Sequence, residues 1–325
     1  MKKIISFFII LFLIFLCFEI LTESKSILAA ASFSLSIWKS NIFPSLFPFF
    51  VLSEIMIIYG IPDFLGNLLK PIMNKLFRLN SKSAFILVMS IISGNPSNAK
   101  YTRELYLNGD LNKYEATKIL CFSCFSNPLF ILGTVALMFL NNKAVGTLIL
   151  FCHYIGNIII GLFLRNYYPS NDDNSNISFV KAIEAMHQKR ISNNDSFGKI
   201  FTNSLVNSIN TLILILGVMT MCLVFTTIID NNVNLNSVFQ SSLNGMIEIT
   251  QGLKYISLEA LPLKIKTILS VMILSFGGFS VHLQIVSILS DTDIKYLPFL
   301  SARIVHAIIS GILTFLLFDF WVTFN

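Results

Sequence analysis

Long apolar stretches alternate with short polar ones along the whole chain. A helix needs about 20 predominantly apolar residues to cross a bilayer. Six stretches are long enough, at about 4–21, 43–60, 118–140, 145–164, 205–229 and 299–320. Two others are interrupted: residues 84–94 are too short to cross and end in Gly-Asn-Pro, and residues 266–290 contain two adjacent glycines. The pattern predicts an all-α, polytopic membrane protein with two broken segments.

Composition supports this prediction. Of the 325 residues, 54% are hydrophobic and only 12% are charged, whereas charged residues make up about 25% of a typical soluble protein. The net charge of +6 comes from Lys and Arg residues scattered through short loops. They form no basic face interleaved with aromatic residues, as nucleic-acid binding would require. We therefore expect an integral membrane protein surrounded by lipid, with no nucleic-acid partner.

The N-terminal stretch and the positive charges predict the topology. Residues 4–21 follow Lys2 and Lys3 and exceed the 7–15-residue apolar core of a signal peptide, so an uncleaved anchor is favoured. With Lys2 and Lys3 inside, the positive-inside rule places both termini in the cytoplasm for six spans, and equally for eight. The side on which Lys100–Lys113 lies distinguishes these two counts.

The two halves of the chain follow the same order of elements. Each contains a span, an apolar run broken at glycine (SGNP from residue 93, and FGGFS from residue 276), a charged linker and another span. The first half would start outside and the second inside, so the repeats would be inverted, as in many secondary transporters. We expect an N-terminal anchor and connector, a first repeat with its linking helix, a polar cytoplasmic linker and a second, inverted repeat, at residues 1–40, 41–164, 165–203 and 204–325.

The breaks are the candidate substrate site. Irregular backbone at membrane depth persists where it is buried in protein or lines a cavity, and the N-terminus of a half-helix attracts anions. Packing by small residues is the simpler alternative. A third break, Ser126-Asn127-Pro128, interrupts the span at 118–140. The candidate substrate-binding residues are Ser93, Gly94, Asn95, Ser97, Asn98, Ser126, Asn127, Gly277, Gly278, Ser280, His282 and Gln284. Of the last three, Ser280 and Gln284 are four residues apart and share a helix face, so they are preferred to His282.

Charged residues in apolar surroundings are candidates for balancing a substrate's charge or for binding a coupling ion, Na⁺ or H⁺. These are Glu54, Lys100, Glu248 and Arg303. Plainer explanations stand beside each, such as a hydrogen bond between helices for Glu54 and snorkelling for Arg303. The chain has no P-loop, HExxH or GxSxG motif. We therefore expect no enzymatic activity, no cofactor and no metal site.

Several segments carry a resemblance to a known family. The segments SGNPSNAK, NPLFILGTV, HYIGN, EITQG, FGGFSVHLQIVSIL and ARIVHA occur in this order between residues 93 and 307. The chain resembles sporulation integral membrane proteins of the YlbJ/SpoVV type, in the nucleoside-transporter and gate-domain superfamily, over roughly residues 40–320. The resemblance implies a fold like that of concentrative nucleoside transporters, with inverted repeats and two re-entrant hairpins.

The same resemblance implies transport of a small organic anion, dipicolinic acid, during endospore formation. The location would be the bacterial cell membrane or the membrane around the forespore, and a homo-oligomer is compatible with it. Lys100 or Arg303 would supply the counter-charge, while Ser280, His282 and Gln284 would orient the anion. Asn95 and Asn98 depart from the family pattern, so the first-half site is altered. The alternatives are a nucleoside or other metabolite permease, and a non-transporting scaffold for spore-envelope assembly.

Overall fold

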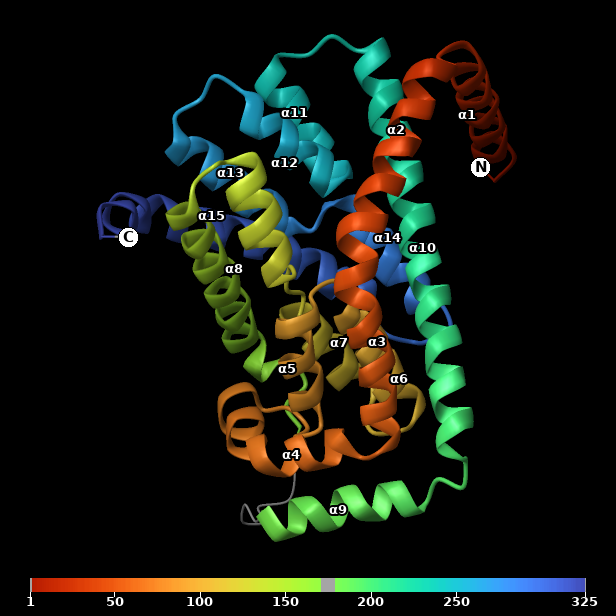
Figure 1. The fold of residues 1–325 in the computed structure, drawn as a ribbon, viewed down its shortest axis with the longest axis vertical. Coiled ribbons are helices and arrows are strands. Elements are labelled where there is room, and N and C mark those ends of the chain that lie inside the picture. The colour runs from red at the N-terminus through yellow and green to blue at the C-terminus, as the bar shows by residue number, and fades with distance from the viewer. Residues whose placement is uncertain (1, 171–178, 325) are drawn as a thin grey trace.

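Helices are the only regular secondary structure in the part of the chain that this computed structural model describes, residues 2–170 and 179–324 (Figure 1). Six described helical stretches are long and apolar enough to cross a membrane: Ile4–Thr22, Ser24–Ile58, Lys143–Asn166, Phe197–Asn232, Leu263–Ile288 and Tyr296–Thr323. The all-α class is therefore confirmed for the described residues, together with six candidate membrane spans.

One predicted span is not continuous, and one predicted interruption is confirmed. Residues 118–140 do not form one span, because α7 (Lys113–Phe122) ends and a π-helical segment, η3 (Phe130–Phe139), begins only after an irregular stretch. Residues 266–290, predicted to be long enough to cross but interrupted at Gly277-Gly278, are interrupted there, because α13 (Leu263–Phe276) ends and α14 (Gly278–Ile288) begins. The proline after Asn127 cannot donate a backbone hydrogen bond, and so it favours the interruption in the first case.

One wall of the molecule is made by helices from both halves. The chain rises through α1 (Lys2–Thr22) and returns through α2 (Ser24–Ile37), the π-helical segment η1 (Trp38–Ile42) and α3 (Phe43–Ile58). Beside them, α10 (Phe197–Asn232) runs in the opposite direction over its whole length (Figure 1). Side-chain hydrogen bonds join α10 to the α2–η1–α3 stretch: the Ser34 and Thr220 hydroxyls lie 2.7 Å apart, and the Trp38 indole donates to the Leu212 carbonyl at 2.9 Å.

Two helical hairpins stand against this wall from opposite ends. The first consists of α5 (Ser83–Ser93) and α6 (Ser97–Leu107), and the second of α11 (Ser237–Ile247) and α12 (Ile249–Leu258). In Figure 1 the first lies toward the end that carries α4 (Ile61–Pro71), and the second lies at the other end. A Cβ on Gly252 would lie 2.0 Å from the Gly245 Cα, so only glycine permits α11 and α12 to approach this closely.

The remaining long helices pack into a bundle beside the hairpins. Here α15 (Tyr296–Phe324) contacts α7, α8 (Lys143–Phe163) and α13 (Leu263–Phe276). The main hydrophobic core runs through these helices, where fully buried side chains such as Ile119, Leu148 and Val271 pack together. Close packing of these side chains makes the bundle rigid. The bundle therefore holds the helix breaks in fixed positions.

The break at Gly277 is not the tip of a hairpin, although the sequence predicted one there. At this residue α13 passes into α14 (Gly278–Ile288), and φ is +94° at Gly277 and +58° at Gly278. Both angles lie in the left-handed region that glycine adopts without a Cβ penalty. The chain changes direction there without folding back, and the second hairpin is instead α11–α12, whose tip is Glu248.

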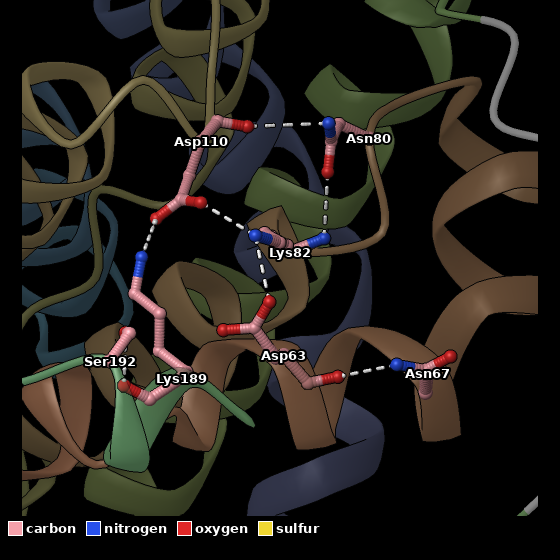
Figure 2. Close-up of polar contacts among 7 residues, drawn as sticks. All are labelled: Asp63, Asn67, Asn80, Lys82, Asp110, Lys189 and Ser192. Carbon is pink, nitrogen blue, oxygen red and sulfur yellow. Dashed lines mark hydrogen bonds and ion pairs between the residues drawn. The ribbon is translucent and has the colours of Figure 1, made fainter. Parts of the chain in front are cut away.

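A cluster of charges anchors the base of the first hairpin (Figure 2). The Lys82 ammonium lies 2.7 Å from an Asp63 carboxylate oxygen and 2.6 Å from one of Asp110, and Asp110 also lies 3.8 Å from the Lys189 ammonium. Burial lowers the pKa of Lys82, but hydrogen bonds and attraction from the two carboxylates outweigh burial and raise the pKa above 10.5 overall. Lys189 belongs to α9 (Phe179–Ile191), so this part of the polar linker is a helix packed on α4.

Candidate functional site

A cavity of about 490 Å³ lies between the α2–α3/α10 wall and the broken segments. Its polar lining comes from both halves of the chain. One side is apolar, with Ile42, Leu46, Ile215 and Met219 contributed by the wall. The polar lining residues are Ser40, Asn41, Ser45, Asn95, Ser126, Asn127, Thr134, Glu248, Thr250, Ser280 and Gln284.

Four irregular points of the backbone meet at this cavity. The first hairpin contributes Asn95 from its tip, and the second contributes Glu248. The break between α7 and η3 contributes Ser126, and the helix that follows the Gly277 break contributes Ser280. Interrupted backbone of this kind leaves free the N–H and C=O groups that would be hydrogen-bonded to each other in a continuous helix. The cavity is therefore a place where a polar molecule could replace missing intrahelical partners.

The first hairpin tip is locked onto the first break. Gly94 has φ +81°, and a Cβ placed on it would lie 2.5 Å from the Asn127 backbone nitrogen. The Asn127 side chain donates to the Ser93 carbonyl at 2.9 Å and accepts from the Leu129 N–H at 2.7 Å, so it also starts the next helix. The side-chain oxygen of Asn95 is buried and has no hydrogen-bond partner among the described residues, which leaves it available to a ligand.

The second hairpin tip meets the second break in a similar way. A Cβ on Gly278 would lie 3.0 Å from the Ile249 side chain and 3.3 Å from the Gly245 carbonyl oxygen. Glu248 begins α12: one carboxylate oxygen accepts from the Gln251 N–H at 2.9 Å, and the other lies 3.3 Å from the Thr250 hydroxyl. A carboxylate in this position satisfies free N–H groups and the positive end of the helix. Glu248 is thus both a helix cap and a lining residue.

Arg303 lies beneath the first break and not in the cavity. Its side chain is fully buried, and its guanidinium donates to the backbone carbonyls of Cys121 and Cys124 and to the Asn157 side-chain oxygen at 2.9 Å. Because Cys121 is in the last turn of α7, its carbonyl lacks an intrahelical donor. Arg303 therefore caps α7, which leaves it engaged and away from the lining where a substrate's counter-charge was expected.

Two histidines complete the support of this break. The His153 Nε2 accepts from the Ser126 N–H at 2.9 Å, so its Nδ1 carries the hydrogen and donates to the Ser275 hydroxyl at 2.9 Å. The His306 Nε2 donates to the His153 carbonyl at 2.8 Å, and its Nδ1 accepts from Arg303 at 2.9 Å. These tautomers are assigned from the hydrogen-bond network. The HYIGN and ARIVHA segments thus hold the break in shape.

Lys100 and Glu54 form a buried ion pair outside the cavity lining. The Lys100 ammonium lies 2.6 Å from a Glu54 carboxylate oxygen, with only 6% and 8% of the two side chains exposed. Asn207 of α10 donates to the other Glu54 oxygen at 3.3 Å, and the Lys100 ammonium lies 4.6 Å from the centre of the Phe50 ring. Breaking such a pair leaves an uncompensated buried charge. These contacts hold α6 to the wall, so neither charge is free for a substrate.

The other predicted residues lie near the cavity without lining it. His282 lies 3.0 Å from the Phe276 carbonyl and 2.9 Å from the Tyr296 hydroxyl, in a ring of aromatic side chains. Gly277 and Gly278 shape the second break. Ser93, Ser97 and Asn98 are fully buried around the first hairpin tip, and Gly94 lies at that tip. Of the predicted set, the cavity is lined by Asn95, Ser126, Asn127, Glu248, Ser280 and Gln284.

Five polar lining residues were not among the predicted site residues: Ser40, Asn41, Ser45, Thr134 and Thr250. Asn41 and Thr134 belong to the π-helical segments η1 and η3, and the Asn41 amide lies 3.5 Å from the Thr134 hydroxyl. Thr250 follows the tip of the second hairpin. Hydrophobic periodicity gives no sign of a π-helical register, although such segments are frequent at functional sites. For Thr250, the neighbouring Glu248 in an otherwise apolar stretch was the available signal.

The lining residues suit a small polar solute with an apolar face. Glu248 supplies a carboxyl group, and the described lining contains no Lys, Arg or His. The other polar lining groups are hydroxyls and amides, which both donate and accept hydrogen bonds. Ligand sites commonly combine a mostly apolar wall with a few placed polar groups. The described lining offers hydrogen-bonding groups that can orient a molecule, and it contains no paired nucleophile and base.

Comparisons with known proteins agree with this picture. Residues 40–143 match the family model Gate, described as nucleoside recognition. The chain is 35% identical over 341 residues to the sporulation integral membrane protein YlbJ of Bacillus subtilis (strain 168). This alignment covers 98% of the present chain and 84% of that relative. No solved structure matches the chain. The resemblance seen in the sequence is confirmed, and the chain belongs to the YlbJ family of sporulation integral membrane proteins.

Proposed function

We propose that this protein is a membrane transporter that carries a small polar solute by alternating access around the central cavity. The observation that carries this proposal is the convergence of two hairpin tips and two helix breaks on one cavity. Broken helices of this kind form the substrate sites of many secondary transporters near the middle of the bilayer. The family model described as nucleoside recognition supports a small-molecule solute.

The arrangement of the helices supports an inverted repeat with re-entrant hairpins. In the first half the order is α3, the α5–α6 hairpin, the broken pair α7–η3 and α8; in the second it is α10, the α11–α12 hairpin, the broken pair α13–α14 and α15. In Figure 1, α3 and α10 run in opposite directions and the hairpins enter from opposite ends. Each hairpin tip packs on the break of its own half, Gly94 on Asn127 and Gly278 on Ile249. This matching differs from the sequence-based one, which paired residues 93–98 with residues 277–284.

For the solute we keep the small organic anion that the resemblance implies, dipicolinate during endospore formation. The lining limits how such a dianion would bind, because it contains the Glu248 carboxyl group and no cationic side chain, while Lys100 and Arg303 are engaged elsewhere. Burying like charges together without compensation is costly. The dianion therefore binds together with a coupling ion, Na⁺ or H⁺, that offsets the charge. A nucleoside is the second candidate, favoured by the neutral hydroxyl and amide groups of the lining and by the matching family model.

Substrate protection of a cysteine in the cavity tests this proposal. Cys17 is the exposed native cysteine in the described chain, so the background carries Cys17→Ser. Ser280→Cys is expected to react with a small aqueous thiol reagent, and dipicolinate or uridine should slow the reaction by occupying the cavity. Ser290→Cys, at an exposed position after α14, serves as the control whose labelling neither solute changes. A Ser280→Cys that stays unreactive in all conditions would favour the non-transporting scaffold.

A further inference from the structure

An ion pair joins the two halves of the chain at the base of the first hairpin. Arg103, on α6, lies with its Nε 2.8 Å from one Asp291 carboxylate oxygen, and its terminal amine contacts the other oxygen. The two residues are 188 positions apart in the chain. Two parallel N–H···O bonds from a guanidinium to a carboxylate fix geometry as well as adding energy. The contact therefore holds α6 in register with the segment that follows α14.

The position of Asp291 relates this ion pair to the cavity. Ser280 and Gln284 of α14 line the cavity. Asp291 lies in the turn just after α14, which ends at Ile288. α14 itself packs beside α6, the helix that carries Arg103. α14 thus connects the residues that line the cavity to the turn that carries Asp291.

The matching part of α6 contains buried polar groups without partners. Between Asn95, which lines the cavity, and Arg103, the side chains of Asn98 and Thr102 are fully buried. Both amide atoms of Asn98 and the hydroxyl of Thr102 have no hydrogen-bond partner among the described residues. Buried polar groups are almost always paired with protein, water or a ligand. The segment between the cavity and the ion pair therefore contains the polar side chains that a pathway for a polar solute would need, packed shut in this structure.

The charge cluster of Figure 2 shows which parts would move together. Lys82, just before α5, pairs with Asp110, just after α6, and with Asp63 of α4, so the base of the hairpin is tied to the rest of its own half. The Arg103–Asp291 contact crosses to the other half instead. Arg103 also lowers the pKa of the Asp291 carboxyl below its usual value, so the pair stays charged at physiological pH.

We propose that the Arg103–Asp291 ion pair is a gate that closes the cavity on the side of α4 and α9. When the pair is intact, α6 and α14 are held together and the polar segment between them is shut. When the halves separate, the pair breaks and the cavity opens toward that side. This inference rests on the proposed function and names the contact that regulates access to its site.

Charge reversal and charge exchange test the gate. The probe is Gln284→Cys in the Cys17→Ser background, labelled in oriented vesicles by a membrane-impermeant thiol reagent added on the α9 side. Arg103→Glu is expected to raise the labelling rate by about fivefold, equivalent to ~1 kcal/mol, the upper end for an exposed ion pair. The double variant Arg103→Glu/Asp291→Arg is expected to return the rate to its original value.

A second exposed ion pair provides the matched control. Lys264 lies 2.5 Å from Asp319, and both belong to the second half, so Lys264→Glu should leave the labelling rate unchanged. A labelling rate that does not change with Arg103→Glu, or that rises equally with Lys264→Glu, would overturn the gate. This readout needs no transported solute. A protein that moves neither dipicolinate nor uridine but still shows the Arg103-dependent labelling would refute the proposed function and leave the gate standing.

Discussion

Arg303→Met is expected to lower the free energy of unfolding by about 3 kcal/mol or more, because it leaves several buried acceptors without a donor. These acceptors are the carbonyls of Cys121 and Cys124 and the side-chain oxygen of Asn157. Methionine fills a similar volume but donates no hydrogen bond. The first break would lose its cap, and the cavity would lose the geometry of Ser126. Thermal unfolding of the purified protein in detergent measures the effect.

Two further variants separate the hydrogen bonds from the charge. Arg303→Lys keeps a positive charge but cannot present the planar fork to three acceptors at once, so it should recover only part of the stability. Arg190→Met, at an exposed position of α9 where the guanidinium lies 5.3 Å from the centre of the Tyr59 ring, serves as the control and should change stability by about 1 kcal/mol or less. An Arg303→Met protein as stable as the Arg190→Met control would contradict the assigned capping role.

Gly94→Ala is expected to abolish transport by displacing the first hairpin tip. The added Cβ would lie 2.5 Å from the Asn127 backbone nitrogen, and the backbone at Gly94 has φ +81° and ψ −173°, a conformation that is essentially restricted to glycine. The tip must therefore move away from the break, which moves Asn95 relative to the cavity. Uptake of solute into proteoliposomes is expected to fall by about tenfold or more, since small misplacements of a site cost this much.

Gly217→Ala provides the control for this substitution. Gly217 is inside α10, and a Cβ there meets nothing within 4 Å. Alanine in a helix interior is favoured over glycine by about 1 kcal/mol, so this variant should keep its uptake and be at least as stable as the parent. Equal uptake by the Gly94→Ala and Gly217→Ala proteins would show that the tip geometry is unimportant.

Hydrophobic pattern alone identified the membrane class, because length and apolarity directly reflect the thickness of the bilayer. The hydrophobic pattern did not predict where the chain reverses direction. Gly277 and the tip at Glu248 both appear in the sequence as polar interruptions, and only packing decides that the chain reverses at Glu248 and continues at Gly277. The closeness of Gly245 and Gly252, which makes that reversal possible, involves contacts that no local pattern reports.

The candidate site was only partly predictable for a related reason. Of the polar residues beside breaks that the sequence singled out as candidates, Asn95, Ser126 and Gln284 line the cavity. Charged residues were harder to place: Arg303 and Lys100 looked suited to an anion, yet each is occupied by partners that are distant in sequence. A single sequence shows which groups need partners, but the fold decides which partners they receive.

Uptake of radiolabelled dipicolinate and uridine by proteoliposomes tests the central claim most directly, with Gly94→Ala proteoliposomes as the matched inactive control. The account predicts saturable dipicolinate uptake by the parent protein, dependent on a Na⁺ or H⁺ gradient, and little uptake by the Gly94→Ala protein. Saturable uptake of uridine alone would keep the transporter and replace its solute. Uptake of neither solute above that of protein-free liposomes, together with a Ser280→Cys that no solute protects, would contradict the account.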